Sequence, residues 1–436
     1  MFKRKKQRKA AWVFIVLFAI SIMSIGTGWA SSTNKFVFWT WGDWTFYKKA
    51  FDLFVKDYPQ YEGIEFENIQ SPDSDEQIKK LIMAYATGTG IPDCIECPSG
   101  YIPELADAGV LLDLTKRIQP YLKDIPTPVL DSVSRHGKVW AVPWRPNTGM
   151  LFYRRDIFDM AGIDPGAIET WDDYIAAGKK VSRTLGGKER FMTNVGGTEL
   201  QYYKVEMFLG LQDGLSIFDP NTGDTLIDKD PRAIEALSLL DKFIKEGIAV
   251  QMDDWSGSWW AALKEGRVAS IVTANWMTEI MKKQAPETKG KWGIMLLPAF
   301  KKGGSRYAFQ SGSANVAGTS ETEMPDVVWE YMRHSFLDIE TTVELNKTWW
   351  ATPAYLPAQK DPFFHQTSEF YGGQYVRELE FEIQENAKMP HYTANNVEAS
   401  SYIMAELMKA IEGQKTVEQA IRDAATTIRR KIGESL

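Results

Sequence analysis

Five consecutive segments near the start of the chain alternate between strand and helix patterns. Residues 36–41 form a short apolar run typical of a buried strand, and residues 45–57 repeat apolar side chains at helical spacing. Residues 63–69 (GIEFENI) then predict a second strand, residues 74–88 a helix stopped by a glycine, and residues 92–97 (PDCIEC) a third strand. This order is typical of an α/β protein built on a doubly wound sheet.

The turn between the first strand and the first helix is rich in indole rings. Trp39, Trp41 and Trp44 lie around Gly42 and Asp43 in the stretch FVFWTWGDWTF. Trp39 falls within the apolar run and is expected in the core. Aromatic rings at the end of a strand, interleaved with a carboxylate, favour a surface that holds a ligand.

The alternation breaks down at residues 136–153. Two strand-like runs in this segment are interrupted by Pro143 and Pro146. Because proline cannot donate to a strand ladder, we predict an irregular or crossing segment here rather than one strand.

The later elements have ordinary start and stop signals. Thr170 followed by Asp173 predicts a helix with a capping box, and Asp230 with Pro231 opens a helix that ends at Gly247. Two further strands and two further helices are expected at residues 268–274, 292–298, 326–338 and 416–432.

Length and charge limit the class of protein. The chain has 436 residues, enough for two domains of ordinary size, and a net charge of −7. The first 30 residues carry six of the 50 basic residues and no acidic one, so the rest of the chain has 44 bases against 57 acids. A surface this acidic argues against nucleic-acid binding, which needs a basic footprint.

The basic N-terminus precedes an apolar segment. KRKKQRK is followed by AAWVFIVLFAISIMSIG, and Gly28 and Ala30 stand at the −3 and −1 positions of a cleavage site, which predicts a signal peptide at residues 1–30. A retained N-terminal membrane anchor is the alternative. No later segment is apolar for long enough to span a bilayer. We therefore expect an exported protein, in the periplasm or at the cell surface.

Cysteine and histidine are too few to suggest a metal or a cofactor, and we expect neither. Cys94 and Cys97 have no second pair with which to bind zinc, and the four histidines are scattered. In an exported protein these cysteines are compatible with a local disulfide or with two half-buried thiols, and the sequence leaves both open. The acidic run at residues 219–230 lacks the closing glutamate of a calcium loop, so we expect a turn there.

Six stretches, in order along nearly the whole chain after the signal segment, resemble the extracellular solute-binding proteins (family 1) of carbohydrate ABC importers. They are GTGIPDCI, HGKVWAVPW, LFYRRDIFDMAGIDPGAIETWDDY, WWAALKEGRVASIVTANWM, IMLLPAFKKGGSRYAFQSGSANVAGTS and GQKTVEQAIRDAATTI. Each stretch is a weak signal alone, but the ordered set is specific. Cys94 and Cys97 depart from the family pattern, which gives them no role.

The resemblance implies an α/β, two-lobed periplasmic-binding-protein-like fold of type II, each lobe a sheet flanked by helices. The N-terminal lobe would comprise residues 34–146 and 299–338. The C-terminal lobe would comprise residues 147–298 and 342–436. Segments crossing between the lobes, the first of them the proline-interrupted run, would leave a cleft that holds the ligand.

A sugar site needs aromatic rings and polar side chains together. The C–H face of a pyranose stacks on an indole and leaves water, whereas its hydroxyls must regain hydrogen bonds, because an unpaired buried polar group costs about 1–3 kcal/mol. Ligands of open α/β sheets lie beyond the carboxyl ends of strands. From the loops and the resemblance together, the expected ligand contacts are Trp41, Asp43, Trp44, Trp144, Arg145, Asn147, Trp255, Trp276, Gly312, Trp349 and Tyr355.

Other candidates are expected to be structural or stay open. Trp171, Trp292 and Trp329 are expected to pack in the interior. Glu96, on the third predicted strand, either reaches the cleft or lies solvated on the surface.

The leading hypothesis is a monomeric, non-enzymatic protein that binds a mono- or oligosaccharide and delivers it to the permease of an ABC importer. A secreted glycoside hydrolase is an alternative, since Asp43, Asp253 and Asp254 lie near aromatic residues and such an enzyme needs two carboxylates. A binder of a non-sugar polyol ligand is another. A polyol phosphate would need a cationic pocket, and Arg145 is the one basic residue among the candidates, which is weak evidence for such a pocket.

Overall fold

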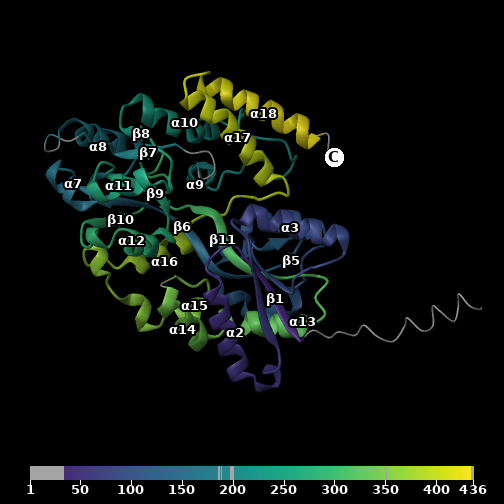
Figure 1. The fold of residues 1–436 in the computed structure, drawn as a ribbon. Coiled ribbons are helices and arrows are strands. Elements are labelled where there is room, and N and C mark those ends of the chain that lie inside the picture. Colours follow the sequence, from purple (N-terminus) through teal and green to yellow (C-terminus); the bar gives the residue numbers. More distant parts are fainter. Residues whose placement is uncertain (1–33, 185–186, 188, 197–200, 350, 434–436) are drawn as a thin grey trace, which may run out of the picture.

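A computed structural model of the protein describes residues 34–184, 187, 189–196, 201–349 and 351–433. The predicted signal peptide lies outside these residues. Two lobes lie on either side of the long strands β6 (Val142–Arg154) and β11 (Phe309–Gly318), which run between them (Figure 1).

The main sheet has seven strands in the order β10–β6–β11–β3–β1–β2, with β9 also paired to β6. The other strands of this sheet are β1 (Lys35–Thr40), β2 (Glu65–Gln70), β3 (Cys94–Pro98), β9 (Ser270–Ala274) and β10 (Trp292–Met295). β1 pairs in parallel with β2 and β3. All pairs that involve β6 or β11 are antiparallel. The sheet is therefore mixed, with a parallel part in the first lobe.

The first lobe confirms the predicted strand–helix alternation. Helix α2 (Thr45–Asp57) follows β1, and α3 (Ser74–Thr87) follows β2. Gly88 closes α3 with a φ of 67°, a left-handed conformation in which glycine has no steric penalty. This arrangement brings the loops after β1 and β2 and the end of β3 to one edge of the sheet.

Within the segment predicted to be irregular or crossing, residues Val142–Arg154 form a single 13-residue strand, β6, so the prediction that no single strand runs through the prolines was wrong. The prolines are tolerated because the ladder to β11 shifts register beside each of them, between Phe309–Thr148 and Ser313–Pro146 and between Ala314–Arg145 and Asn315–Pro143. β6 does cross between the lobes. Its first half pairs with β11, and residues from Gly149 onward pair with β9 and β10.

The second lobe surrounds β9 and β10 with helices. They are α7 (Arg155–Met160), α8 (Trp171–Thr184), α9 (Gln201–Leu211), α10 (Pro231–Lys245), α11 (Gly257–Glu265), α12 (Met277–Gln284), α17 (Asn396–Ile411) and α18 (Val417–Gly433). The strands β7 (Thr193–Val195) and β8 (Ala249–Gln251) form a separate parallel pair. The predicted capping box of α8 is present: Thr170 Oγ1 donates to Asp173 Oδ2 (2.7 Å), and the Asp173 N–H donates to Thr170 Oγ1 (3.2 Å).

The helix α14 (Ile339–Trp349) packs against α2 and against α13 (Pro325–Phe336) of the first lobe (Figure 1). α17 and α18, by contrast, pack on α9 and α10 of the second lobe. The lobe boundaries given above stay a prediction, and α14 lies on the first-lobe side although its residues from 342 onward were assigned to the second.

Short elements complete the fold. They are α4 (Ile102–Asp107), α5 (Thr115–Ile118), α6 (Thr127–Asp131), α15 (Leu356–Gln359), α16 (Val376–Asn386), the hairpin β4 (Ser134–Arg135) with β5 (Lys138–Val139), and the 3₁₀ turns η1 (Pro59–Tyr61), η2 (Ser99–Tyr101), η3 (Gln119–Asp124), η4 (Pro165–Ala167), η5 (Pro286–Thr288), η6 (Pro362–His365) and η7 (Glu369–Tyr371).

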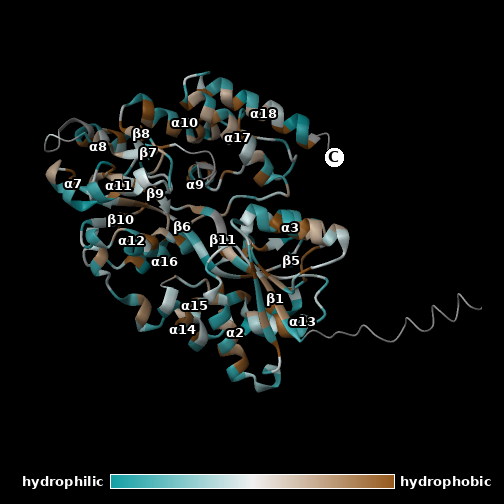
Figure 2. Ribbon diagram, viewed as in Figure 1, coloured by the Kyte–Doolittle hydropathy of each residue, from teal (hydrophilic) through white to brown (hydrophobic). Residues whose placement is uncertain are grey.

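Apolar side chains form two hydrophobic clusters, and hydrophilic and hydrophobic residues alternate along helices such as α3 and α18 (Figure 2). Trp39, Trp292 and Trp329 are buried in the first cluster and Trp171 in the second, as predicted. Indoles outside these two cores are free to contact a ligand.

Cys94 and Cys97 are free, buried thiols on β3. They stand three residues apart on a strand, which turns their side chains to opposite faces. Burial raises the pKa of both thiols.

Candidate functional site

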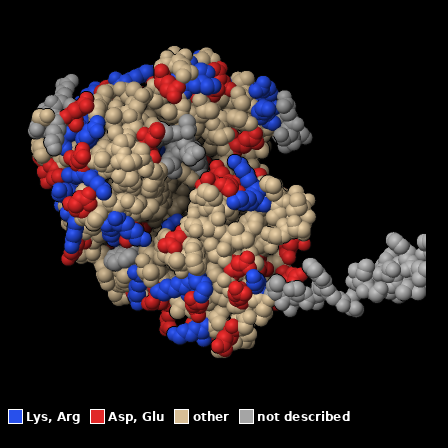
Figure 3. Space-filling view, in the orientation of Figure 1, with Lys and Arg blue, Asp and Glu red and all other residues tan. Residues whose placement is uncertain are grey.

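A cavity of about 600 Å³ lies between the lobes, at the edge of the sheet where β1, β2 and β3 end. The space-filling view is hollowed between the two lobes (Figure 3). The walls come from the loop after β1, the start of α3, the crossing strands β6 and β11, the loop after β9, and helices α12, α14 and α16. The volume falls within the roughly 300–1,000 Å³ of typical small-molecule sites.

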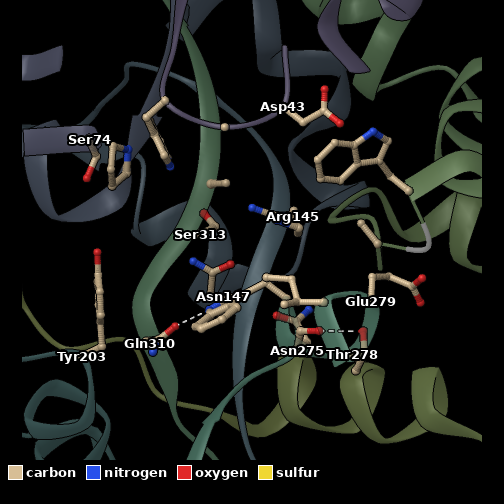
Figure 4. Close-up of a pocket in the computed structure, with 18 of the residues that line it drawn as sticks. Asp43, Ser74, Arg145, Asn147, Tyr203, Asn275, Thr278, Glu279, Gln310 and Ser313 are labelled. Carbon is tan, nitrogen blue, oxygen red and sulfur yellow. Dashed lines mark hydrogen bonds between the residues drawn. The ribbon is translucent and has the colours of Figure 1, made fainter. Parts of the chain in front are cut away.

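Seven of the predicted contact residues line this cavity. They are Trp41, Asp43, Arg145, Asn147, Trp255, Trp276 and Trp349. Figure 4 shows Asp43 and Glu279 on one side of the space, Ser74 and Tyr203 on the other, and Arg145 and Asn147 between them. Segments more than 300 residues apart in the sequence thus meet at one site.

Trp144 does not line the cavity, contrary to expectation. Its side chain is 4% exposed, and its ring stacks on Phe46 with centroids 4.6 Å apart. Successive side chains of a strand point to opposite faces, so Arg145 in the cavity wall places Trp144 in the core. The two remain in contact, with the Arg145 guanidinium 4.9 Å from the Trp144 ring centroid.

Two more of the predicted contacts, Trp44 and Tyr355, do not line the cavity. The surroundings of a third, Gly312, are not described. Trp44 is the N-cap residue of α2 and is 39% exposed outside the cavity lining. Tyr355 is buried near Tyr121, with ring centroids 6.4 Å apart. Gly312 lies on β11, but its surroundings are outside the described part of the structure.

Several lining residues were missed from the sequence. Asp73 and Ser74 follow β2 and reach the cavity from the N-terminus of α3, where Asp73 accepts from the Glu76 N–H (2.7 Å). Their place after a strand is the same signal that pointed to Asp43, and it could have found them. Tyr203 and Glu380 had no comparable signal, because α9 and α16 reach the site only through tertiary packing.

The second lobe supplies an aromatic wall. Trp255 and Trp276 stack with ring centroids 5.6 Å apart and planes 25° apart. Trp276 is oriented by its Nε1–H, which donates to Gln310 Oε1 of β11 (2.5 Å). Trp255 keeps 38% of its surface exposed. On the other side, the Lys283 ammonium lies 5.5 Å from the ring centroid of Trp349.

Asn275 and Glu380 form a buried polar wall beside these rings. The Asn275 amide nitrogen donates to Pro146 O (3.0 Å) and to Glu380 Oε2 (3.1 Å), which also accepts from the Thr352 hydroxyl. The Asn275 amide is thereby fixed in orientation, because a flip would set its oxygen against two acceptors. Burial raises the pKa of the Glu380 carboxyl to about 7, although the hydrogen bonds from Thr352 and Asn275 oppose this rise.

Glu96 lies close to the Trp41–Asp43 loop but outside the cavity lining. It is buried on β3 and does not line the cavity, so neither of the roles left open for it applies. Burial raises the pKa of its carboxyl, and the positive charge of Arg145 acts against that rise. A Cβ added to Gly42 would lie 3.6 Å from Glu96 Oε2, so the tip of the Trp41–Asp43 loop rests close to this carboxyl.

A family model described as bacterial extracellular solute-binding protein matches residues 42–338, more than half of the chain. The chain belongs to this family. Two relatives of this solute-binding protein are named arabinooligosaccharide-binding proteins. The one from Halalkalibacterium halodurans is 24% identical over 88% of each chain, and the one from Bacillus subtilis is 23% identical over 92% of this chain and 93% of the relative.

A solved structure shares the fold of this solute-binding protein. It is the ABC transporter associated binding protein from B. animalis subsp. lactis, solved in complex with beta-1,6-galactobiose. The TM-score is 0.75 at 22% sequence identity, with 93% of this chain and 98% of the other covered. The two-lobed α/β fold is therefore that of the periplasmic binding proteins.

Family membership also bears on location. The family is extracellular, so this solute-binding protein is an exported protein. Among the residues that the structure describes, no helix is both long enough and apolar enough to cross a bilayer. Within the same residues, no cluster of three or more histidine, cysteine or acidic side chains is arranged to hold a metal ion.

Proposed function

We propose that this solute-binding protein captures an oligosaccharide in the cavity between its lobes and delivers it to the permease of an ABC importer. The observation that carries the proposal is the pairing of indoles with fixed polar groups in the lining of one cavity, above all Trp255 and Trp276 beside Asn275. The indole rings offer an apolar face on which the C–H groups of a sugar can stack. The amides and carboxylates offer partners to hydroxyls.

The ligand class is supported by relatives on two lines of comparison. The two sequence relatives are named for arabinooligosaccharides, and the solved structure above holds a galactobiose. A site of about 600 Å³ walled by Trp41, Trp276 and Trp349 from three different elements suits a ligand of more than one sugar ring.

Binding without catalysis is the second part of the proposal. A glycoside hydrolase needs two carboxyl groups, one acid and one nucleophile or base, flanking the scissile bond. The four carboxylates in the cavity lining all have partners within the protein, and those of Glu380 are Asn275 and Thr352. Asp43 accepts from the Thr45 N–H and hydroxyl, Asp73 caps α3, and Glu279 pairs with Lys282 at 2.5 Å. Incubation with labelled oligosaccharides is expected to give stoichiometric capture, and turnover would contradict the proposal.

The way in which the protein works follows from its two lobes. We propose that a monomer closes its lobes around the ligand by a hinge motion at the crossing strands, and that residues 1–30 direct export. The lobe boundaries predicted above are part of this proposal. Mass spectrometry of the secreted protein tests the cleavage after Ala30, since a retained segment would instead indicate an anchor.

The test of the ligand class is a thermal-shift screen with arabinotriose, maltotriose, β-1,6-galactobiose, a polyol phosphate and amino acids. A ligand that binds only the native state raises the melting temperature by mass action. At least one oligosaccharide is expected to raise it. A response to the polyol phosphate or an amino acid, with none to any saccharide, would overturn the proposal.

A further inference from the structure

We propose that a buried ion pair between Lys204 and Asp254, joined by Asn194, is the positioning device that holds Trp255 in the cavity wall and so sets ligand affinity. None of these three residues lines the main cavity. The inference rests on the proposed function, because the affinity concerned is that for an oligosaccharide.

Trp255 has an unusual backbone conformation. Its φ of 69° is left-handed, and it shares a positive φ with only two other non-glycine residues in the described part of the chain, His136 and Asp213. For a bulky residue this conformation costs roughly tenfold in an equilibrium constant. It persists only where the surroundings determine it.

Asp254, the residue before Trp255, is held on both carboxylate oxygens. Asn194 Nδ2 donates to Oδ1 (2.6 Å), and the Lys204 ammonium donates to Oδ2 (3.2 Å). Both charged side chains are nearly buried, at 9% and 10% exposure. A buried pair of this kind is costly to break, since either charge alone would be left without its partner.

The same asparagine ties this pair to the surrounding backbone and to α11. Asn194 Nδ2 also donates to Met252 O (3.1 Å), and Asn194 Oδ1 accepts from Trp259 Nε1 (3.1 Å). Asn194 thereby links β7, the loop before Trp255 and the helix after it.

The residue after Trp255 is fixed as well. Ser256 is the N-cap of α11: its Oγ accepts from the Trp259 N–H (3.1 Å) and donates to Asp253 O (2.8 Å). With both neighbours held, Trp255 has little choice of backbone conformation. The Trp255 ring stacks on the Trp276 ring, and the exposed part of the Trp255 ring faces the cavity.

A small chamber of about 20 Å³ lies behind the two indoles, and the ion pair keeps the Trp255 ring from turning toward it. Lys204, Asp254, Trp255, Trp259 and Trp276 are among its walls. It has room for about one water molecule. Without the charge of Lys204, Asp254 would lose its ion pair, and the Trp255 ring could then turn away from the ligand.

The test is a double-mutant cycle on affinity, measured by calorimetry with whichever of arabinotriose, maltotriose or β-1,6-galactobiose binds the wild-type protein most tightly. Lys204→Met is expected to weaken binding roughly tenfold, which is the cost of the left-handed conformation. In the Trp255→Ala background the same change is expected to have no further effect, because the ring that it positions is gone.

Two variants serve as controls. Lys242→Met breaks an exposed pair with Asp172 (2.7 Å) in the same lobe and should leave affinity unchanged. Lys204→Arg keeps the charge and should retain most of the affinity. Where Lys204→Met does not fold, Asp254→Asn takes its place in the cycle.

Hydrogen exchange of residues 252–260 gives a readout that needs no ligand. Faster exchange in the Asp254→Asn variant is expected, and unchanged exchange would overturn the proposal. Equal affinity losses from Lys204→Met in both backgrounds, or no loss, would also overturn it. If the wild-type protein binds none of the saccharides, the proposed function fails instead.

Discussion

At the scale of single residues, the site depends on indoles that remain outside the core. Trp276 is fixed by its hydrogen bond to Gln310 and lines the cavity, whereas Trp44 is exposed outside it. The two residues therefore form a matched pair of tryptophans, one expected to meet the ligand and one not.

Trp276→Ala is expected to weaken saccharide binding by about 2 kcal/mol, the value of burying one large apolar side chain. Titration calorimetry measures the change. Trp44→Ala is the control and should bind like the wild type. Equal losses in the two variants would show that the effect is not local to the cavity.

Glu380→Gln is expected to change how stability depends on pH. The folded-state pKa of Glu380 is about 7, above its ordinary value of 4.5, so the folded protein holds a proton that the unfolded chain releases between these pH values. Its contribution to stability is thus fully present below about pH 4.5 and is lost as the pH rises through about 7.

The variant has no such carboxyl, so its stability relative to the wild type should rise between pH 5 and pH 8. The rise is at most on the order of 3 kcal/mol, at ~1.4 kcal/mol per pKa unit. Urea unfolding at a series of pH values measures it. A difference between variant and wild type that is constant with pH would show that Glu380 keeps an ordinary pKa.

At the scale of elements, short turns join α2 and α3 of the first lobe to the strands that precede them. α3 carries Asp73 and Ser74 to the cavity at its start and ends at Gly88. An added Cβ at Gly88 would meet nothing within 4 Å, so only its backbone conformation requires glycine.

Gly88→Ala is therefore expected to lower the free energy of unfolding by about 1–2 kcal/mol, the cost of a left-handed alanine. Gly257→Ala in α11 is the matched control: it has the same free space and no positive φ, and should be neutral or slightly stabilising. Urea melts compare the two. A neutral Gly88→Ala would contradict the backbone explanation.

Local sequence patterns predicted the elements that have a clear apolar periodicity and clear start and stop signals. The strand–helix alternation of residues 36–97 and the Thr170–Asp173 capping box are examples. β6 was not predicted as one strand, because its prolines are accommodated by a register shift against β11, which is over 150 residues away.

Cavity residues that directly follow a strand could be predicted from the sequence, whereas the other cavity residues could not. Asp43 and Trp41 follow β1 and line the cavity, and their contact with a ligand stays a prediction. Trp144 was misplaced because a one-residue offset on β6 decides between cavity and core. Glu380 was missed, since its position depends on how α16 packs against distant segments.

At the scale of the whole molecule, two lobes meet at β6 and β11 and leave the cavity between them. Ligand contacts from both lobes favour closure, because a ligand shifts a conformational equilibrium only through contacts that differ between the states. Small-angle X-ray scattering should therefore show a smaller radius of gyration with the bound saccharide. An unchanged radius at saturation would contradict hinge closure.

The most direct test is a crystal structure of the protein with its tightest-binding oligosaccharide. We expect a sugar ring on the face of Trp276 or Trp255, hydroxyls within hydrogen-bond reach of Asn147 and Asn275, and both lobes in contact with the ligand. A saccharide bound outside the cavity between the lobes, or held without any indole contact, would contradict the account.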